Sequence, residues 1–169
     1  MGRMIETERL ILRPLEESDA SDVFEWVGDP AVNKYMPYSL YLDIEQVKEW
    51  IRQISDEDYE FGFILKDTGK VIGAGSIGFD SERDAYGLGY NLNKSFWNLG
   101  YATEATKAII QWVYDNLGAR EFVANHATAN IASGNVIRKC GFQFERYGQY
   151  SRFDGSETFD ATFYRMHLD

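Results

Sequence analysis

Hydrophobic residues along the chain recur at two different spacings, one typical of strands and one typical of helices. Alternating or short apolar runs bounded by turn residues predict strands over about residues 5–13, 59–66, 71–79, 86–92, 120–127, 142–151 and 157–168. Apolar residues spaced three and four apart predict helices over about residues 18–28, 44–54, 101–117 and 131–140. Pro14 ends the first strand, because proline cannot donate to a strand ladder.

Capping residues bound several of these helices. Ser18 and Asn130 are predicted N-caps, because their side chains accept hydrogen bonds from the free N–H groups of a first helical turn. Asp43, followed three residues later by Gln46, resembles a capping box. The glycines at predicted C-terminal ends are Gly28, Gly118 and Gly141.

The order of these elements predicts one mixed α/β domain, of the α+β kind, spanning residues 1–169. About seven strands form a mostly antiparallel central sheet, flanked by about four helices. Turn residues at 67–70 and at 154–155 predict two hairpins. The long helix over residues 101–117 joins two strands, which predicts a parallel βαβ crossover within the same sheet.

Length and composition limit the kinds of protein this chain can be. A chain of 169 residues, of which 44% are hydrophobic, fits one folded domain and argues against a disordered protein. The formal net charge is −10 and the chain has no dense run of Lys or Arg, so nucleic acid is not an expected partner. An acidic surface attracts cations and so allows a cationic amine substrate, although the same charge also serves solubility alone.

Cysteine, histidine and apolar runs exclude further classes. Cys140 is the only cysteine, and His126 and His167 are the only histidines, which excludes an internal disulfide and argues against a metal site. No apolar run approaches the ~20 residues of a membrane span, and the start of the chain lacks an apolar signal core. We therefore expect a cytoplasmic protein without membrane contacts, as a monomer or a homodimer.

Residues 73–78, GAGSIG, match the G-x-G-x-x-G pattern of dinucleotide-binding loops. Such a loop needs a strand before it and a helix opening within it, because the helix N-terminus holds the pyrophosphate. Residues 79–84 carry no amphipathic helical stripe. Small residues that allow close packing or a bulge in a strand therefore explain the motif better than a nicotinamide or flavin site does.

A second glycine element has the context of a phosphate site. Residues 88–92 are predicted as a strand and residues 93–98 as a loop, and Leu99 to Thr103 opens the long helix. The first turn of a helix has unpaired N–H groups and a partial positive charge, and a pyrophosphate can use both. Gly100 has no Cβ to block close approach, and Ala102 is nearly as small. By itself, the element also fits an ordinary turn.

Three blocks of sequence, in order and over nearly the whole chain, resemble the GNAT superfamily of acetyl-CoA-dependent N-acetyltransferases. They are ETERLILRP at residues 6–14, Gly89-Tyr90 followed by WNLGYATEA at residues 97–105, and residues 130–142, which begin NIAS and end KCGF. Within the superfamily, the likeness is closest to the ribosomal-protein N-terminal acetyltransferases. The resemblance implies the GNAT fold, acetyl-CoA as donor with CoA as product, and a primary amine as acceptor. That amine belongs to a protein N-terminus, an amino acid, a polyamine or an aminated antibiotic.

The resemblance also implies which residues bind the donor. The family's pyrophosphate loop, Gln/Arg-x-x-Gly-x-Gly/Ala, corresponds to residues 97–102, with Trp97 in place of the basic or amide residue. The strand end from Tyr90 to Leu92 is implied to pair its backbone with the pantetheine arm, splayed apart from the strand that ends near Ala127. Cations near the nucleotide end suit phosphate, although they also fit a solvated helix face. The implied donor-binding residues are Asn91, Leu92, Trp97, Asn98, Leu99, Gly100, Tyr101, Ala102, Thr103, Asn130, Ser133, Asn135, Arg138 and Lys139.

Candidate catalytic residues follow partly from the resemblance and partly from side-chain chemistry. Many family members use a tyrosine acid where this chain has Ile137, and the glutamate base of the ribosomal-protein branch is replaced by Gly87. In that branch the serine at the position of Ser133 is the suggested acid, although Ser133 also fits a plain first-turn residue. His126, with a reference pKa of ~6.5, is a candidate base, although a buried structural histidine is an equally ordinary reading. Further base candidates are Tyr90, Asp80, Glu82 and Asp84.

Aromatic residues are frequent where the resemblance places the acceptor pocket, between the first two helices and the last hairpin. They can hold a cationic amine by cation–π contacts, and core packing is the alternative. They are Trp26, Tyr35, Tyr38, Tyr41, Tyr147, Tyr150 and Phe153. Because the family's glutamate and tyrosine are missing, a CoA-binding module with a sensing or regulatory role stays open beside the enzyme. A Rossmann-type oxidoreductase is a third hypothesis.

Overall fold

The computed structural model describes residues 3–55 and 59–169, which form an eight-stranded sheet with four α-helices. The helices are α1 (Ala20–Val27), α2 (Ile44–Gln53), α3 (Tyr101–Leu117) and α4 (Ile131–Lys139). The strands are β1 (Ile5–Glu6), β2 (Leu10–Arg13), β3 (Glu60–Leu65), β4 (Val71–Asp80), β5 (Ala85–Leu92), β6 (Glu121–Ala127), β7 (Gln143–Ser151) and β8 (Thr158–His167). Short 3-10 turns, η1 (Glu17–Asp19) and η3 (Lys94–Phe96), come before α1 and α3.

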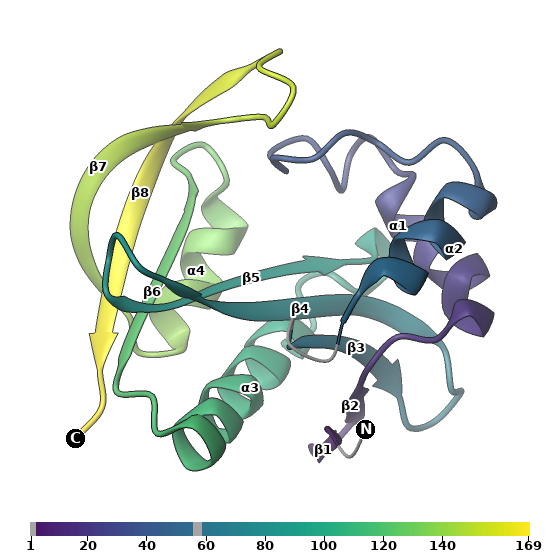
Figure 1. The fold of residues 1–169 in the computed structure, drawn as a ribbon, viewed down its shortest axis with the longest axis horizontal. Coiled ribbons are helices and arrows are strands. Elements are labelled where there is room, and N and C mark those ends of the chain that lie inside the picture. The colour runs from purple at the N-terminus through teal and green to yellow at the C-terminus, as the bar shows by residue number, and fades with distance from the viewer. Residues whose placement is uncertain (1–2, 56–58) are drawn as a thin grey trace.

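The strands lie side by side in the order β1-β2-β3-β4-β5-β6-β8-β7. Every neighbouring pair is antiparallel except β5 and β6, which α3 connects and which run parallel. This confirms the predicted mixed α/β fold, with a mostly antiparallel sheet and one parallel crossover. In Figure 1, α3 lies on one side of the sheet, and α1 and α2 lie on the other.

The strands supply apolar side chains to both faces of the sheet. Phe61 and Phe63 of β3 are buried in one cluster with Ile109 of α3. The next residue, Ile64, is buried in the other cluster with Val23 of α1. Because successive side chains of a strand point to opposite faces, a single strand contributes to both layers of the core.

The segment predicted as one strand over residues 5–13 forms two strands instead. β1 and β2 pair with each other antiparallel, with Ile5 opposite Leu12. Thr7 closes the turn between them, since its N–H donates to the Leu10 carbonyl at 2.9 Å and its hydroxyl accepts from the Leu10 N–H at 3.0 Å. The sheet therefore has eight strands rather than about seven. Residues 6–9 are all polar, so hydrophobic spacing gives no sign of the contacts by which Thr7 closes the turn.

Two predicted N-caps are confirmed. Asp43 accepts a hydrogen bond from the Gln46 N–H at 2.9 Å, and Asn130 accepts one from the Ser133 N–H at 3.3 Å. The predicted capping box is only half formed, because the Gln46 side chain accepts from the Leu42 N–H rather than from the cap residue.

The prediction that Ser18 caps the first helix is wrong. Ser18 lies inside η1, and α1 begins two residues later at Ala20. The carboxylate of Asp19 turns back to accept from the Glu16 N–H and from Arg13, both at 2.8 Å. These contacts hold residues 17–19 in a 3-10 turn before the helix. The preference of serine for N-cap positions does not predict such a turn.

The glycine motif at residues 73–78 lies inside β4 and opens no helix. A Cβ at Gly73 would collide with the carbonyl oxygen of Asn91, and one at Gly75 would lie 3.0 Å from the Phe63 ring. The small residues let β4 pack closely against its neighbours. This confirms the structural interpretation and removes the basis for a nicotinamide or flavin site at the motif.

β5 and β6 pair with each other only at one end. Their pairing stops at Gly87 and Val123. β5 nevertheless stays paired with β4 as far as Leu92, and β6 with β8 as far as Ala127. The two strands therefore remain regular while they diverge, and their facing backbone edges have no strand partner beyond this point. The opening they create is where the candidate site lies.

Candidate active site

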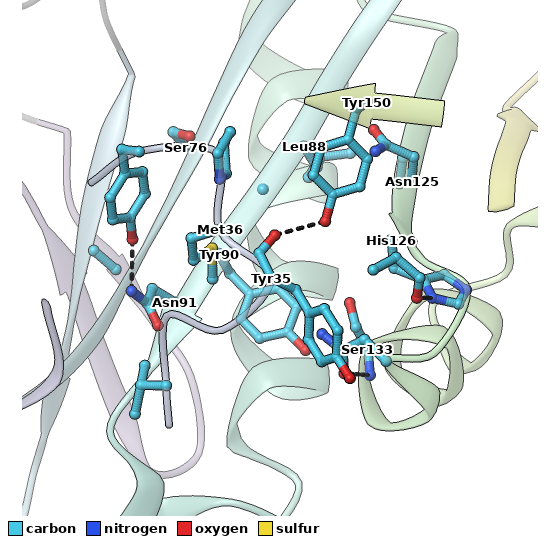
Figure 2. Close-up of a pocket in the computed structure, with 18 of the residues that line it drawn as sticks. Tyr35, Met36, Ser76, Leu88, Tyr90, Asn91, Asn125, His126, Ser133 and Tyr150 are labelled. Atoms are coloured by element: carbon cyan, nitrogen blue, oxygen red, sulfur yellow. Dashed lines mark hydrogen bonds between the residues drawn. The ribbon is translucent and has the colours of Figure 1, made fainter. Parts of the chain in front are cut away.

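A cleft of about 740 Å³ opens where β5 and β6 diverge. Part of its wall comes from β5, β6 and the first turn of α4. Other parts come from β3 and β4, from the segment between α1 and α2 and from the hairpin of β7 and β8. Figure 2 shows Tyr90 and Asn91 of β5 on one side of the cleft and Asn125 and His126 of β6 on the other.

Hydrogen bonds join the hairpin of β7 and β8 to the segment between α1 and α2. Tyr150 Oη donates to the Tyr35 carbonyl at 2.6 Å (Figure 2). Arg152 donates to the carbonyls of Met36 at 2.8 Å and Lys34 at 2.7 Å. Two segments far apart in sequence are thus held together along one side of the cleft.

Tyr90 and Ser133 meet where β5 faces the first turn of α4. Burial raises the pKa of the Tyr90 phenol above its ordinary value, and a hydrogen bond with the Ser133 side chain opposes part of that rise. Asn130 orders the turn by accepting from the Ser133 N–H. Two protonated hydroxyl groups therefore lie together at neutral pH, as a proton donor to a leaving group requires.

His126 lies in the wall between β6 and α4, and both of its ring nitrogens are engaged. Nδ1 lies 2.6 Å from the Ala127 carbonyl oxygen, so it carries the proton and donates it. Nε2 lies 3.1 Å from the Tyr164 hydroxyl, which itself accepts from Arg138 Nη1 at 3.1 Å. Burial, together with the charge of Arg138, lowers the pKa of His126, so the ring is neutral at pH 7. A neutral ring whose lone pair already accepts from Tyr164 offers no base to the cleft.

The N-terminus of α3 follows Gly100, whose φ is +86°. This left-handed conformation favours glycine, and glycine has no side chain to cap the helix. The Glu104 N–H bonds back to the Gly100 carbonyl at 3.0 Å, as the first intrahelical bond. The N–H groups of the preceding turn, together with the helix dipole, form a place for an anion.

Arg9, in the turn between β1 and β2, braces the start of α3 and was missed as a functional residue. Its Nε donates to Glu104 Oε1 at 2.8 Å, and its Nη1 donates to the Leu99 carbonyl at 2.9 Å. The guanidinium carbon also lies 4.0 Å from the centre of the Tyr101 ring. A cation therefore stands beside the helix N-terminus of an acidic protein. Arg9 lies within the first block of resemblance, but only the fold shows its contact with a residue 95 positions away.

The loop before α3 is anchored by Trp97. Its indole Nε1 donates to the Leu92 carbonyl at 2.9 Å, where β5 ends. Asn93 accepts from the Ser95 N–H at 3.0 Å and begins η3. The side chain that replaces the family's basic or amide residue therefore positions the loop through its ring N–H.

Asn91 joins β5 to the segment between α1 and α2. Its side-chain nitrogen donates to Tyr38 Oη at 2.6 Å and to Asn33 Oδ1 at 3.1 Å. Its side-chain oxygen accepts from the Leu92 N–H at 2.9 Å. Burial raises the pKa of the Tyr38 phenol far above its usual value. The Asn91 side chain is therefore committed to contacts within the protein.

Residues 9–143 match the acetyltransferase (GNAT) domain family. The chain belongs to this family. An N-acetyltransferase of Bacillus licheniformis is 33% identical over 147 residues, which cover 82% of each chain. A crystal structure of a GNAT-family acetyltransferase from Bacillus anthracis is 25% identical, with a TM-score of 0.85 over 97% of this chain and 98% of that one. The protein is thus an N-acetyltransferase, and its family uses acetyl-CoA.

Two more distant structures share the fold of this acetyltransferase. A ribosomal-protein-S5-alanine acetyltransferase from Vibrio fischeri is 19% identical, with a TM-score of 0.77 over 98% of this chain and 97% of that one. The Microcin C7 self-immunity acetyltransferase, solved with acetyl-CoA and AMP, is 20% identical, with a TM-score of 0.82 over 95% and 93%. The expected likeness to the ribosomal-protein acetyltransferases is therefore confirmed at the level of the fold.

Acetyl-CoA fits this acetyltransferase on features of its own structure. The backbone edge of β5 beyond Gly87 has no strand partner on the side of β6 and can pair with an extended pantetheine arm. The N-terminus of α3 suits a pyrophosphate, and a Cβ at Gly100 would narrow the approach there, 3.3 Å from Arg9 Nη2.

The polar residues of α4 are only partly placed as the resemblance implied. Arg138 turns toward β8, where it donates to Tyr164, and its Nη2 donates to Asn135 Oδ1 at 2.6 Å. Lys139 is exposed at the end of α4 that lies near α3, where Cys140 Sγ is 4.0 Å from the Thr103 carbonyl. The Arg138 side chain is therefore engaged with Tyr164 and Asn135.

The lone cysteine of the acetyltransferase has no sign of a nucleophile. Burial raises the pKa of the Cys140 thiol to about 11, with the charge of Lys107 opposing the shift. The thiol is therefore protonated at neutral pH, and the reactive species in cysteine chemistry is the thiolate.

The carboxylates considered as alternative bases do not line the cleft. Asp80, Glu82 and Asp84 lie at the turn between β4 and β5, at the end where β5 still pairs with β6. Glu60, at the start of β3, does line the cleft and was missed. Its position beside the cleft depends on strand pairing, so no local motif marks it.

All but one of the predicted acceptor aromatics line the cleft. The exception is Tyr147, which is 72% exposed and whose ring centre lies 4.9 Å from that of Phe144. Tyr147 and Tyr150 are three residues apart on β7, and an odd separation puts two side chains on opposite faces of a strand. The aromatics that do line it are Trp26, Tyr35, Tyr38, Tyr41, Tyr150 and Phe153.

Within residues 3–55 and 59–169, no three His, Cys, Asp or Glu side chains are placed to hold a metal ion together. None of the helices in these ranges is both long enough and apolar enough to cross a membrane.

Proposed function

We propose that this acetyltransferase moves the acetyl group of acetyl-CoA directly to a primary amine that enters the cleft beside Tyr90. The observation that carries the proposal is the divergence of β5 and β6 next to the N-terminus of α3. When bound, acetyl-CoA supplies the acetyl group as a thioester, which a neutral amine attacks. The acceptor is a small molecule or a peptide.

Donor binding is proposed to rest mainly on main-chain groups. The N-terminus of α3 takes the pyrophosphate, with Arg9 close by as a positive charge. The partnerless edge of β5 holds the pantetheine arm, and Lys139 lies at the end of α4 nearer to α3. The residues proposed to bind the donor are Asn91, Leu92, Trp97, Asn98, Leu99, Gly100, Tyr101, Ala102, Thr103, Asn130, Ser133 and Lys139.

Tyr90 and Ser133 are proposed to supply the proton that a leaving thiolate needs. The Tyr90 phenol is protonated at neutral pH, burial raises its pKa further, and the Ser133 side chain interacts with it. Many family members place a tyrosine where this chain has Ile137. The phenol of Tyr90 reaches the cleft from β5 instead, so the same chemical group comes from another element.

The proton lost by the attacking amine is proposed to leave through water in the open cleft. His126 was the candidate for this step, but its Nδ1 donates to Ala127 and its Nε2 accepts from Tyr164. A Cβ on Gly134 would lie only 2.8 Å from Nε2. His126 is therefore proposed as a positioning residue that packs β6 against α4.

Release of CoA thiol, measured with acetyl-CoA and a panel of primary amines, tests this function. We expect amine-dependent release above the rate of hydrolysis. If CoA binds tightly while every amine gives only background hydrolysis, the protein is a CoA-binding module and the proposal is wrong.

A Gly100→Glu variant tests the donor site separately. The new side chain would start from a residue whose φ is +86°, and its carboxylate would repel the pyrophosphate. We therefore expect CoA binding to be lost. Gly69→Glu is the matched control, because Gly69 has a φ of +77° in the turn between β3 and β4 with open space around its Cβ. Unchanged CoA affinity in a folded Gly100→Glu protein refutes the pyrophosphate site.

A further inference from the structure

Charged side chains are scarce in the described lining of the cleft. Among the described residues that line it, Glu60 is the one whose side chain carries a formal charge at pH 7, since His126 is neutral. No Lys or Arg side chain belongs to that described lining. From the part of the lining that the structure describes, a ligand therefore meets the carboxylate of Glu60 and no cationic side chain. This favours a cationic ligand over one that bears a carboxylate.

Glu60 stands in an aromatic part of the wall. The rings of Tyr38 and Tyr41 lie 6.3 Å apart between centres, and those of Tyr41 and Trp50 lie 6.0 Å apart. Burial raises the pKa values of Tyr38 and Tyr41, and the nearby charge of Glu60 adds to both shifts. The carboxylate is therefore close to these phenols. Aromatic faces and a carboxylate together form a favourable site for an ammonium group.

The strand register sets the distance between Glu60 and the part of β5 next to Tyr90. Glu60 of β3 pairs with Ser76 of β4, and Ser76 pairs with Gly89 of β5. All three residues line the cleft, and Gly89 precedes Tyr90. Neighbouring strands lie about 4.8 Å apart, so the Cα atoms of Glu60 and Gly89 are separated by about 10 Å. A few methylene groups bridge such a gap once the Glu60 side chain extends toward the ligand.

We propose that Glu60 binds a second cationic nitrogen of the acceptor, so that the preferred substrates are diamines or polyamines. One nitrogen is held by Glu60 and the aromatic wall, while the other, in its neutral form, lies beside Tyr90 and is acetylated. This inference rests on the proposed transfer to amines and names the class of amine. The net charge of −10 also raises the local concentration of such cations near the protein.

Three four-carbon amines test how the charge at the far end of the acceptor affects acetylation. They are putrescine, butylamine and γ-aminobutyrate. They present a cationic, a neutral and an anionic tail to Glu60. We expect putrescine to have a kcat/KM at least about tenfold above butylamine, and γ-aminobutyrate to be the poorest. Putrescine should also bind the CoA-loaded protein in calorimetry, which gives a readout that needs no turnover.

Glu60→Gln removes the charge and keeps the shape of the side chain. We expect this variant to raise KM for putrescine about tenfold while kcat and the KM for acetyl-CoA change little, which brings putrescine and butylamine close together. Glu60→Lys should reverse the order in favour of γ-aminobutyrate. Glu45→Gln is the matched control, since Glu45 is an exposed carboxylate on α2 whose side chain pairs with Lys48. Thermal unfolding of each variant checks that it is folded.

The outcomes separate this inference from the proposed function. Equal kcat/KM for putrescine and butylamine in the wild type overturns the role of Glu60 and leaves acetyl transfer intact. So does acetylation of a peptide amine but of none of the three probes, or a putrescine KM that Glu60→Gln leaves unchanged. Absence of acetyl transfer to every amine, with CoA still bound, contradicts the proposed function itself.

Discussion

Replacing Glu104 by Gln tests how the start of α3 is held in place. Glu104 Oε2 accepts from Thr7 Oγ1 at 2.6 Å and from the Arg9 N–H at 2.9 Å. Its Oε1 accepts from Arg9 Nε at 2.8 Å. Glutamine keeps the size of the side chain but has one oxygen and no charge. Its amide N–H₂ group therefore faces at least one of these donors, and that hydrogen bond is lost.

The magnitude follows from burial and charge. A hydrogen bond to a charged group contributes about 1.5–3 kcal/mol when it is shielded from water. The Glu104 side chain is 18% exposed but the Arg9 side chain is 39% exposed, so solvent screening discounts their ion pair. We expect Glu104→Gln to lower the free energy of unfolding by about 2 kcal/mol. For a domain of this size, that lowers Tm by about 4–8 °C.

The pH dependence gives a sharper test than the size of the effect. Burial alone would raise the pKa of Glu104, but hydrogen bonds from Thr7 and Arg9 outweigh it and hold the pKa below its ordinary value of 4.5. A group with a lowered pKa stabilises the folded protein above its unfolded-state pKa, and loses that effect as the pH falls through the folded-state pKa. The difference in Tm between wild type and variant should be full at pH 7 and shrink below about pH 4.5.

Circular dichroism melts at pH 7 and at pH 3 measure this difference, and initial rates against acetyl-CoA concentration give KM. We expect KM for acetyl-CoA to rise several-fold, because Arg9 also holds the Leu99 carbonyl before the helix. Glu45→Gln serves as the exposed control and should match the wild type. An equal Tm at pH 7, or a difference that persists undiminished at pH 3, refutes the reasoning.

Three other predictions concern single side chains. Ser133→Ala should lower kcat about tenfold or more and change KM for acetyl-CoA much less, and an unchanged rate would show that Ser133 serves only the helix start. Trp97→Phe loses the hydrogen bond to the Leu92 carbonyl and should raise KM for acetyl-CoA several-fold, so an equal KM contradicts the anchoring role. In NMR titrations, burial should put the pKa of His126 below 6.5, while the hydrogen bond to Glu121 should put that of His167 above it. The opposite order would show that these causes are misassigned.

The direction of the pKa shift of His126 determines how this residue makes the free energy of unfolding depend on pH. Because its pKa is lowered in the folded protein, protonation favours the unfolded state. This residue therefore contributes full stability well above pH 6.5, and that contribution decreases as the pH falls below 6.5, the unperturbed value. Melting of a His126→Gln variant across this range checks the sign.

Local features of the chain were predictable because their causes are local. The hairpin turns, the Asn130 and Asp43 caps and the glycine ends of the helices all depend on a few neighbouring residues. The turn at Thr7 and the tight start of α1 escaped prediction. In both places the chain is a run of polar residues whose side-chain hydrogen bonds set the turn, and hydrophobic periodicity carries no signal there.

The site was predictable only where a motif keeps its parts together. The loop before α3 and the first turn of α4 are contiguous stretches, so their residues could be named in advance. Arg9 and Glu60 come from strands or turns distant in sequence, and neither belongs to a local donor-binding or catalytic signal. The Tyr164 contact that occupies His126 Nε2 likewise crosses from β8 to β6.

The sequence by itself determined the mixed α/β fold, the parallel crossover and the family, because periodicity, turn chemistry and contiguous motifs act over short stretches of chain. Tertiary structure decided which charges meet. It set Arg9 beside the start of α3, turned Arg138 toward Tyr164, engaged both nitrogens of His126 and left Glu60 as the charged group of the described cleft lining. The physical reason is that hydrogen bonds and charge contacts depend on distance in space, and strand pairing brings together residues that the chain keeps far apart.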